Sequence, residues 1–274
     1  MELGIAVRSM GPQSAPEVLL ACVRVAEEAG LADVWVQDHV AIPPDDAEGS
    51  GGRYLDPLTA LAWLAAATRR IGLGTGVLIL PYRPALPTAK AIATVQELSG
   101  GRLRLGVGAG WMDAEFRALG VPREERGRRT DETLAFLCDC FAADEVRAHG
   151  QKFLFLPRPP RPPIYVGGAG EHALRRTVRF GDGWMPMTGD PERLAPGIAR
   201  LRALADEAGR DLPEVIAFTG LDPSRADALL ERIEALAALG VSRVVVGTRY
   251  ANAGEFSRQV DLVADRILPA LPRI

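Results

Sequence analysis

The sequence predicts an α/β fold, a single (β/α)8 barrel of the TIM-barrel type that takes in residues 1–274. Three observations predict it. Short runs of β-branched and aliphatic residues alternate with helical segments, as in the βα units of a parallel sheet. Eight such runs occur, which is the number of strands in this barrel. The chain length also suits one domain of this kind.

The eight expected strands are nearly continuous apolar runs, as strands buried on both faces should be. They are expected at Leu3–Val7, Val34–Gln37, Ile71–Gly76, Leu103–Gly108, Ile164–Gly167, Gly183–Met187, Val215–Thr219 and Arg243–Gly247.

The helices between these strands have recognisable start and stop signals. Three aspartates stand before a proline suited to the first helical position: Asp56, Asp190 and Asp222. Ser14 and Glu17 have the spacing of a capping box ahead of the first helix. Four glycines stand where helices should end, each shortly before the next strand: Gly30, Gly181, Gly209 and Gly240.

Two stretches interrupt the alternation. Asp38–Asp56 is a long polar connection after the second strand, and long loops in compact domains are usually functional or disordered. Arg147–Pro163 carries Phe153, Phe155 and many prolines, which predicts a short hairpin insertion before the fifth strand. No linker divides the chain. An open doubly wound sheet is the alternative fold, because it has the same local alternation.

Composition excludes several classes of protein. The formal net charge is −3 and the basic residues are scattered, so we expect no nucleic-acid partner and no membrane partner. Three cysteines, Cys22, Cys138 and Cys140, fit a reducing compartment. A strand-like run begins at Leu3 without a signal-peptide pattern before it, so a cytoplasmic location is expected.

Glycine-rich turns follow three of the expected strands, where the active site of a barrel lies. They are Gly72–Val77, Gly106–Trp111 and Gly167–Gly170. Glycine permits close backbone approach to a ligand, and Gly167–Gly170 opens a helix whose free N–H groups suit a phosphate. The alternative is that these glycines only make tight βα turns.

His39 is the candidate catalytic residue. It follows the second strand beside Asp38, and an imidazole there could act as a base or stabilise a developing oxyanion. A nearby carboxylate could orient it, although adjacent residues on a strand point in opposite directions. The alternative is a rim histidine with an ordinary hydrogen bond. His149 and His172 are interpreted as surface residues.

Methionine and tryptophan side chains near the ends of the first, fourth and sixth strands predict an adaptable apolar pocket. They are Met10, Met112, Met185, Met187, Trp111 and Trp184. Alternatively, these side chains cap the barrel interior.

The sequence lacks the residues that a Schiff-base enzyme, a metal site or a CxxC redox site would need. The only lysines, Lys90 and Lys152, fall in a helix and in the insertion, which argues against a Schiff-base enzyme. Three dispersed histidines cannot supply a metal site, so none is expected. Cys138 and Cys140 do not form a CxxC motif.

Several stretches between Gly4 and Gly247 form a combination that is typical of one superfamily. They are Val34–His39, Leu73–Val77, Leu98–Trp111, Gly120–Pro122 with Glu125–Asp131, Pro163–Gly168 and Gly181–Trp184. In these stretches the chain resembles the luciferase-like monooxygenase superfamily, and within it the branch that depends on the deazaflavin coenzyme F420.

The resemblance implies a luciferase-like barrel with a cofactor across the rim and hydride transfer at its central ring. It implies that Gly76–Val77 is a cis peptide behind the ring, that Gly108–Trp111 flank the ring and ribityl chain, and that Gly167–Ala169 hold the phosphate. The full set of cofactor-binding residues expected is Asp38, Thr75, Gly76, Val77, Gly108, Ala109, Gly110, Trp111, Val166, Gly167, Gly168 and Ala169. Substrate contacts are expected from Met10, Met112, Trp184 and Met187.

One departure bears on the substrate. The sugar-phosphate dehydrogenase branch of this superfamily carries a glutamate where this chain has Trp111. We therefore expect a small apolar or aromatic substrate that exchanges hydride with F420. The alternatives are an FMN-dependent monooxygenase that uses molecular oxygen and a non-catalytic flavin-binding protein. The resemblance also implies a homodimer.

Overall fold

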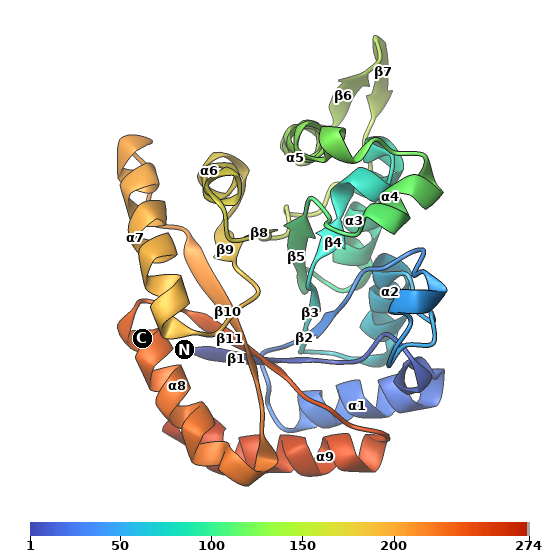
Figure 1. Cartoon of the computed structure of the whole chain (residues 1–274). Coiled ribbons are helices and arrows are strands. Elements are labelled where there is room, and N and C mark those ends of the chain that lie inside the picture. Colours follow the sequence, from blue (N-terminus) through green and yellow to red (C-terminus); the bar gives the residue numbers. More distant parts are fainter. Residues whose placement is uncertain (273–274) are drawn as a thin grey trace.

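The computed structural model describes residues 1–272 and contains a closed barrel of parallel strands with helices outside it (Figure 1). The strand order is β3-β2-β1-β11-β10-β9-β8-β5, and β3 also pairs with β5. This last pairing, with Leu73 opposite Leu103, closes the sheet on itself. The barrel prediction is confirmed, and the alternative of an open doubly wound sheet is wrong.

The eight barrel strands lie close to their predicted positions. Their bounds are β1 Glu2–Ala6, β2 Asp33–Val36, β3 Gly72–Thr75, β5 Leu103–Gly108, β8 Ile164–Gly167, β9 Gly183–Met185, β10 Glu214–Gly220 and β11 Arg243–Gly247. A short additional strand, β4 (Leu78–Ile79), pairs with the end of β5 and was not predicted.

The α-helices follow the strands in sequence and cover the barrel. Their bounds are α1 Pro16–Glu28, α2 Pro57–Ala67, α3 Ala85–Leu98, α4 Asp113–Leu119, α5 Arg126–Ala142, α6 Glu171–Phe180, α7 Pro191–Glu207, α8 Ala226–Ala238 and α9 Ala253–Leu262. The predicted insertion is the antiparallel hairpin of β6 (Glu145–Ala148) and β7 (Gln151–Leu154), which projects away from the barrel in Figure 1.

Most of the predicted signals for the starts and ends of helices are confirmed. Asp56 accepts a hydrogen bond from the N–H of Thr59 at the start of α2, and Asp190 caps α7. Asp222 caps a 3-10 turn that leads into α8. The capping box at Ser14 is wrong: α1 begins at Pro16, and the Ser14 hydroxyl instead donates to the carbonyl of Gly11.

Two separate apolar layers hold the barrel together. Inside it, a small cluster contains Trp35, Tyr165, Met185, Ile216 and Val245. A much larger cluster fills the space between the strands and the surrounding helices. Because alternate residues of a strand point to opposite faces, side chains of one strand divide between these layers.

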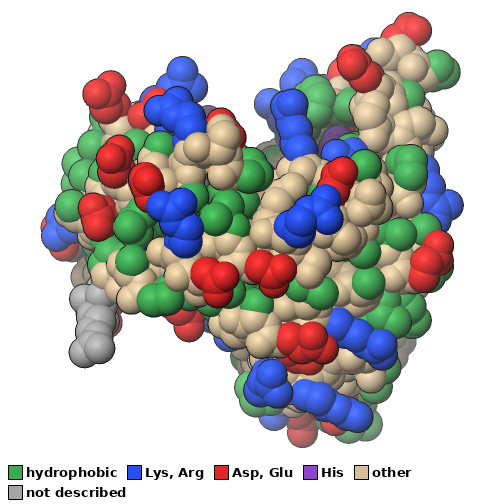
Figure 2. Space-filling view, turned by 90° about the horizontal axis from the view of Figure 1, so that it is seen from below, with side chains coloured by type: hydrophobic (Ala, Val, Ile, Leu, Met, Phe, Trp, Pro, Cys, Tyr) green, Lys and Arg blue, Asp and Glu red, His purple; other side chains and the backbone are tan. Residues whose placement is uncertain are grey.

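Charges of both signs are interspersed on the molecular surface. Figure 2 shows Lys and Arg side chains among Asp and Glu side chains over the face seen from below. Among residues 1–272, every helix is too short or too polar to cross a membrane.

Candidate functional site

The bulge after β3 forms the base of the site. The Gly76–Val77 peptide is cis, as the family resemblance implies. A Cβ on Gly108 would lie 2.6 Å from Cγ2 of Val77, and one on Gly167 would lie 3.1 Å from its Cγ1. These two glycines therefore make room for the Val77 side chain. Their presence is required by packing within the protein, independently of any ligand.

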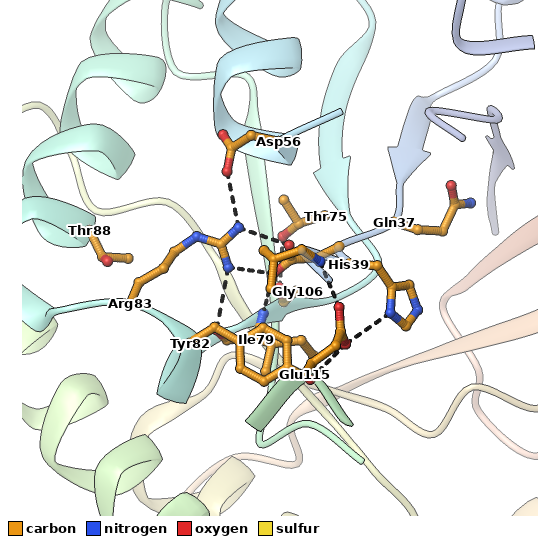
Figure 3. A network of polar contacts seen from close by, with 12 residues as sticks. Gln37, His39, Asp56, Thr75, Ile79, Tyr82, Arg83, Thr88, Gly106 and Glu115 are labelled. Carbon is orange, nitrogen blue, oxygen red and sulfur yellow. Dashed lines mark hydrogen bonds and ion pairs between the residues drawn. The ribbon is translucent and has the colours of Figure 1, made fainter. Parts of the chain in front are cut away.

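Glu115, from α4, is the hub of a polar network at the rim (Figure 3). Its Oε1 accepts hydrogen bonds from the backbone N–H groups of Val40 at 2.6 Å and Ala41 at 3.1 Å. Its Oε2 accepts from the Tyr82 hydroxyl at 2.8 Å and lies 3.0 Å from Nδ1 of His39. The Glu115 side chain is only 1% exposed. Four donors thus surround one buried carboxylate, and His39 is one of them.

The Glu115 carboxyl is held in its charged form. Burial acts to raise its pKa, but the N–H groups of Ala41 and Val40, the Tyr82 hydroxyl and His39 outweigh burial and hold the pKa below its ordinary value. Burial, with the adjacent Glu115 carboxylate, raises the pKa of Tyr82 above its ordinary value, so Tyr82 stays a hydrogen-bond donor.

The lowered pKa of Glu115 predicts how its contribution to stability depends on pH. A carboxyl whose pKa is lower in the folded state stabilises the protein above its unfolded pKa, and this contribution disappears as pH falls through the folded pKa. The difference in unfolding free energy between the wild type and Glu115→Gln should therefore be fully present above the ordinary value of about pH 4.5 and shrink below it. Urea unfolding across this pH range measures it. A difference that stays constant down to pH 3 would contradict the assignment.

The network also fixes which nitrogen of His39 carries a proton. An ionised carboxylate only accepts hydrogen bonds, so Nδ1 must donate to Glu115. In the neutral imidazole, Nε2 is then unprotonated and available as an acceptor. The His39 side chain is 20% exposed, so the imidazole is partly open to solvent at the rim.

Asp38 has a different set of partners. It is 4% exposed, and its two carboxylate oxygens accept from the guanidinium of Arg83 at 2.6 and 2.8 Å. Oδ2 also accepts from the N–H of Ile79 at 2.8 Å. Arg83 reaches further to Asp56 at 3.0 Å and so ties the rim to the start of α2. Asp38 therefore does not orient His39; Glu115 does.

Aromatic side chains flank His39. The ring of Tyr54, from the long loop after β2, has its centroid 4.9 Å from the His39 ring, and the Trp111 ring lies at 6.3 Å. Trp111 is 67% exposed. Met10 forms an isolated antiparallel β-bridge with Tyr54. Met187, after β9, is exposed. The structure thus brings Met10 and Trp111 to the surroundings of His39.

Other predicted pocket residues lie elsewhere. Trp184 is buried in the layer between barrel and helices, packed near Gly197, and not at the rim opening. Its indole N–H donates to the carbonyl of Gly168 at 2.6 Å, so it supports the loop after β8. Met112 is buried at the start of α4, and Met185 lies in the barrel interior. Met185 therefore caps the barrel interior, as the alternative interpretation of these side chains predicted.

The loop after β8 presents unused backbone donors. Within the described chain, the N–H groups of residues 169–172 donate to no other group. They precede or begin α6, where the helix dipole favours negative charge. Of the other predicted cofactor residues, Thr75 and Gly76 lie at the end of β3, where the Thr75 hydroxyl donates to the carbonyl of Gly106, and Ala109 and Gly110 follow β5. Val166, in β8, is buried in the layer between the barrel and the helices, so its side chain does not face the rim.

A second part of the barrel mouth holds a cavity of about 640 Å³ at the ends of β1, β2, β10 and β11. Its lining includes Arg8, Met10, Gln37 and Thr248. Nε of Arg8 and Oγ1 of Thr248 are buried and have no hydrogen-bond partner in the described chain. The lining thus combines the polar side chains of Arg8 and Gln37 with the apolar side chain of Met10.

Residues 1–272 contain no group of His, Cys, Asp or Glu side chains that could hold a metal ion. Sequence reasoning missed Glu115, Tyr82 and Arg83. Glu115 gave one signal, an acidic residue in the first turn of a helix directly after the Gly106–Trp111 run.

Comparison with known proteins identifies the family to which this chain belongs. The model of the luciferase-like monooxygenase family matches residues 3–264, and the chain belongs to this family. An F420-dependent glucose-6-phosphate dehydrogenase of Beutenbergia cavernae is 34% identical over 244 residues, which cover 83% of this chain and 71% of the relative.

Two solved structures show the same fold. An F420-dependent secondary alcohol dehydrogenase, in complex with an F420–acetone adduct, has a TM-score of 0.83 at 20% identity and covers 99% of each chain. A monooxygenase from Streptomyces bottropensis also has a TM-score of 0.83, at 22% identity, with 98% of this chain and 99% of that chain covered. The chain thus has an F420-dependent relative in sequence, and it shares its fold with an F420-dependent dehydrogenase and a monooxygenase.

Proposed function

We propose that this protein is an enzyme, an oxidoreductase that exchanges a hydride between coenzyme F420 and a small organic substrate. The observation that carries the proposal is the His39–Glu115 pair at the rim, with Nε2 of His39 free to accept a proton. The 34% identity to an F420-dependent dehydrogenase over most of the chain supports this choice of cofactor.

The residues present fit a deazaflavin. Val77 would lie behind the ring, Gly108–Trp111 beside it, and the free N–H groups of residues 169–172 would bind the phosphate. The Asp38 carboxylate is bound by Arg83, so Asp38 would not contact the cofactor through its carboxylate. It would instead hold the chain around it in position at the rim. When bound, the deazaflavin supplies a carbon that accepts or returns a hydride.

His39 would move the proton that accompanies the hydride. In alcohol oxidation, Nε2 would accept the hydroxyl proton, and in carbonyl reduction it would return one. Glu115 stabilises the imidazolium that forms in the first case, because its carboxylate stays charged beside Nδ1. Tyr82 and the two backbone donors keep that carboxylate in place.

The surroundings of His39 suggest the kind of substrate. Tyr54 and Trp111 offer aromatic walls, and Met10, which pairs with Tyr54, offers an adaptable apolar contact. The cavity that Met10 also lines adds the polar side chains of Arg8 and Gln37. We therefore propose an apolar or aromatic alcohol or carbonyl compound, and a set of such compounds with and without a polar tail is the appropriate substrate screen.

The first test is the choice of cofactor. Titration of cofactor-free protein should give micromolar binding of F420 and at least tenfold weaker binding of FMN, a difference of about 1.4 kcal/mol. Quenching of tryptophan fluorescence measures both, because Trp111 lies beside the expected ring. A Trp111→Phe variant is the control for the origin of the signal. Preference for FMN would instead favour an oxygen-dependent monooxygenase, and binding of neither would contradict the cofactor site.

We further propose a homodimer in the cytoplasm. The proposed location rests on Cys22, Cys138 and Cys140, which are all free thiols, in keeping with a reducing compartment.

The proposed dimer rests on the helix α2, which contains almost only apolar residues and exposes Trp63, as is typical of a helix that meets another protein surface. Sedimentation equilibrium should give twice the monomer mass, and a monomer at all concentrations would contradict the dimer.

A further inference from the structure

A cavity of about 730 Å³ lies between α5 and α6, beside the expected phosphate loop. Figure 1 shows these two helices next to each other outside β5 and β8. Two of the lining residues join the cavity to the rim: Ala109 follows β5, and His172 lies in the first turn of α6, directly after the Gly167–Gly170 loop. A ligand whose phosphate occupies that loop would therefore have the cavity beyond its phosphate.

The charged side chains of the cavity fall into two groups. Some are paired with each other: Arg128 contacts Glu132 at 2.7 Å, and Arg176 contacts Asp131 at 2.6 Å. The second group, which forms no ion pair within the described chain, consists of Arg126, Arg179 and Glu124. Two arginines in the lining thus keep their charge available.

The contacts of these two arginines leave most of their donors unused. Arg126 donates from its guanidinium to the carbonyl of Arg123 at 3.0 Å. Arg179 lies with its guanidinium carbon 4.6 Å from the centroid of the Phe180 ring. A guanidinium has five N–H donors that match carboxylate oxygens in pairs. The cavity can therefore accept carboxylates.

We propose that this cavity binds the anionic chain that extends beyond the phosphate of an F420-type cofactor, with Arg126 and Arg179 contacting its carboxylates. The inference rests on the proposed function. F420 carries a lactyl group and a chain of glutamates after its phosphate, whereas FMN ends at the phosphate. FMN has no group that could occupy an arginine-lined cavity beyond the phosphate loop. The cavity therefore favours the deazaflavin.

One residue of the lining acts against such a ligand. Glu124 is exposed and forms no ion pair in the described chain. Its carboxylate faces the same cavity, so the two free arginines are opposed by one free acid. Removing this charge should strengthen binding of the anionic chain, and removing either arginine should weaken it.

The test compares two probes by calorimetric titration of the full chain. The long probe is F420 with a defined number of glutamates, and the short probe is the same deazaflavin ending in a 5′-phosphate. Arg126→Gln and Arg179→Gln should each weaken binding of the long probe by about threefold to tenfold and leave the short probe unchanged. Glu124→Gln should strengthen binding of the long probe alone. Arg202→Gln, a surface arginine on α7, is the matched control and should change neither.

Ionic strength gives a second readout that does not depend on activity. The advantage of the long over the short probe should shrink as salt rises, because exposed charges are screened. Equal binding of both probes by the wild type, or arginine variants that affect both probes alike, would overturn this inference alone. Failure of both probes to bind the wild type would overturn the proposed function, and this inference with it. Unchanged binding of the short probe shows that a variant is folded.

Discussion

Replacing His39 by alanine should lower turnover by about 10²- to 10⁴-fold, the usual contribution of a positioned acid or base. The expected loss follows from geometry. Nδ1 of His39 is fixed by Glu115 at 3.0 Å, and Nε2 is left as the nitrogen that faces a substrate. No second imidazole lies near, since His149 is on the hairpin and His172 is on α6.

The affinity for F420 should change little in this variant, because the residues expected to hold the phosphate and the ring are elsewhere on the rim. Stopped-flow measurement of deazaflavin reduction gives turnover, and fluorescence titration gives affinity. His149→Ala, an exposed histidine on the hairpin, is the control and should behave as wild type. Unchanged turnover in His39→Ala with intact binding would remove its catalytic role and would favour a protein that only binds the cofactor.

The barrel could be predicted from the sequence because its signals are local. Each strand is a short apolar run, and each helix has its own start and stop residues, such as Asp56 before α2 and Gly240 after α8. Closure is not local: it depends on β3 meeting β5. The sequence predicted closure only indirectly, because the number of expected strands, eight, is the number that a closed barrel of this type requires.

The partner of His39 could not be predicted in the same way. Asp38 is its neighbour in sequence, yet the two side chains diverge, and Asp38 turns to Arg83. Glu115 comes from a helix 76 positions further along the chain and reaches His39 only because the barrel brings the ends of β2 and β5 to one rim. Sequence identifies which residues can do the chemistry, whereas pairing across the rim is a property of the closed fold.

The pocket residues illustrate a second limit. Trp184 and Met185 are adjacent on β9, but one faces the helices and the other the barrel interior. A side chain near the end of a strand has several possible directions, and composition does not choose among them. Trp111 lies past the end of its strand and is exposed beside His39, which its position in a glycine-rich turn allows.

Replacing Glu115 by glutamine should lower turnover by on the order of 10²-fold by reversing the proton arrangement of His39. Oε1 of Glu115 accepts from two backbone N–H groups, those of Val40 and Ala41, which cannot turn away. The amide oxygen of the glutamine must therefore take this position. Its NH₂ group is then directed at His39 and Tyr82, where Oε2 stood.

An NH₂ group only donates, so Nδ1 of His39 would have to accept from it. The proton of the neutral imidazole would move to Nε2, the nitrogen that the proposed chemistry needs as an acceptor. Nitrogen-15 NMR of labelled histidine should show this change of tautomer directly, without any turnover. Tyr82→Phe is the matched control, because it removes one donor to Glu115 and leaves the carboxylate facing Nδ1. A glutamine variant that keeps the wild-type tautomer, or loses no activity after changing it, would show that Glu115 serves only to hold the loop after β2.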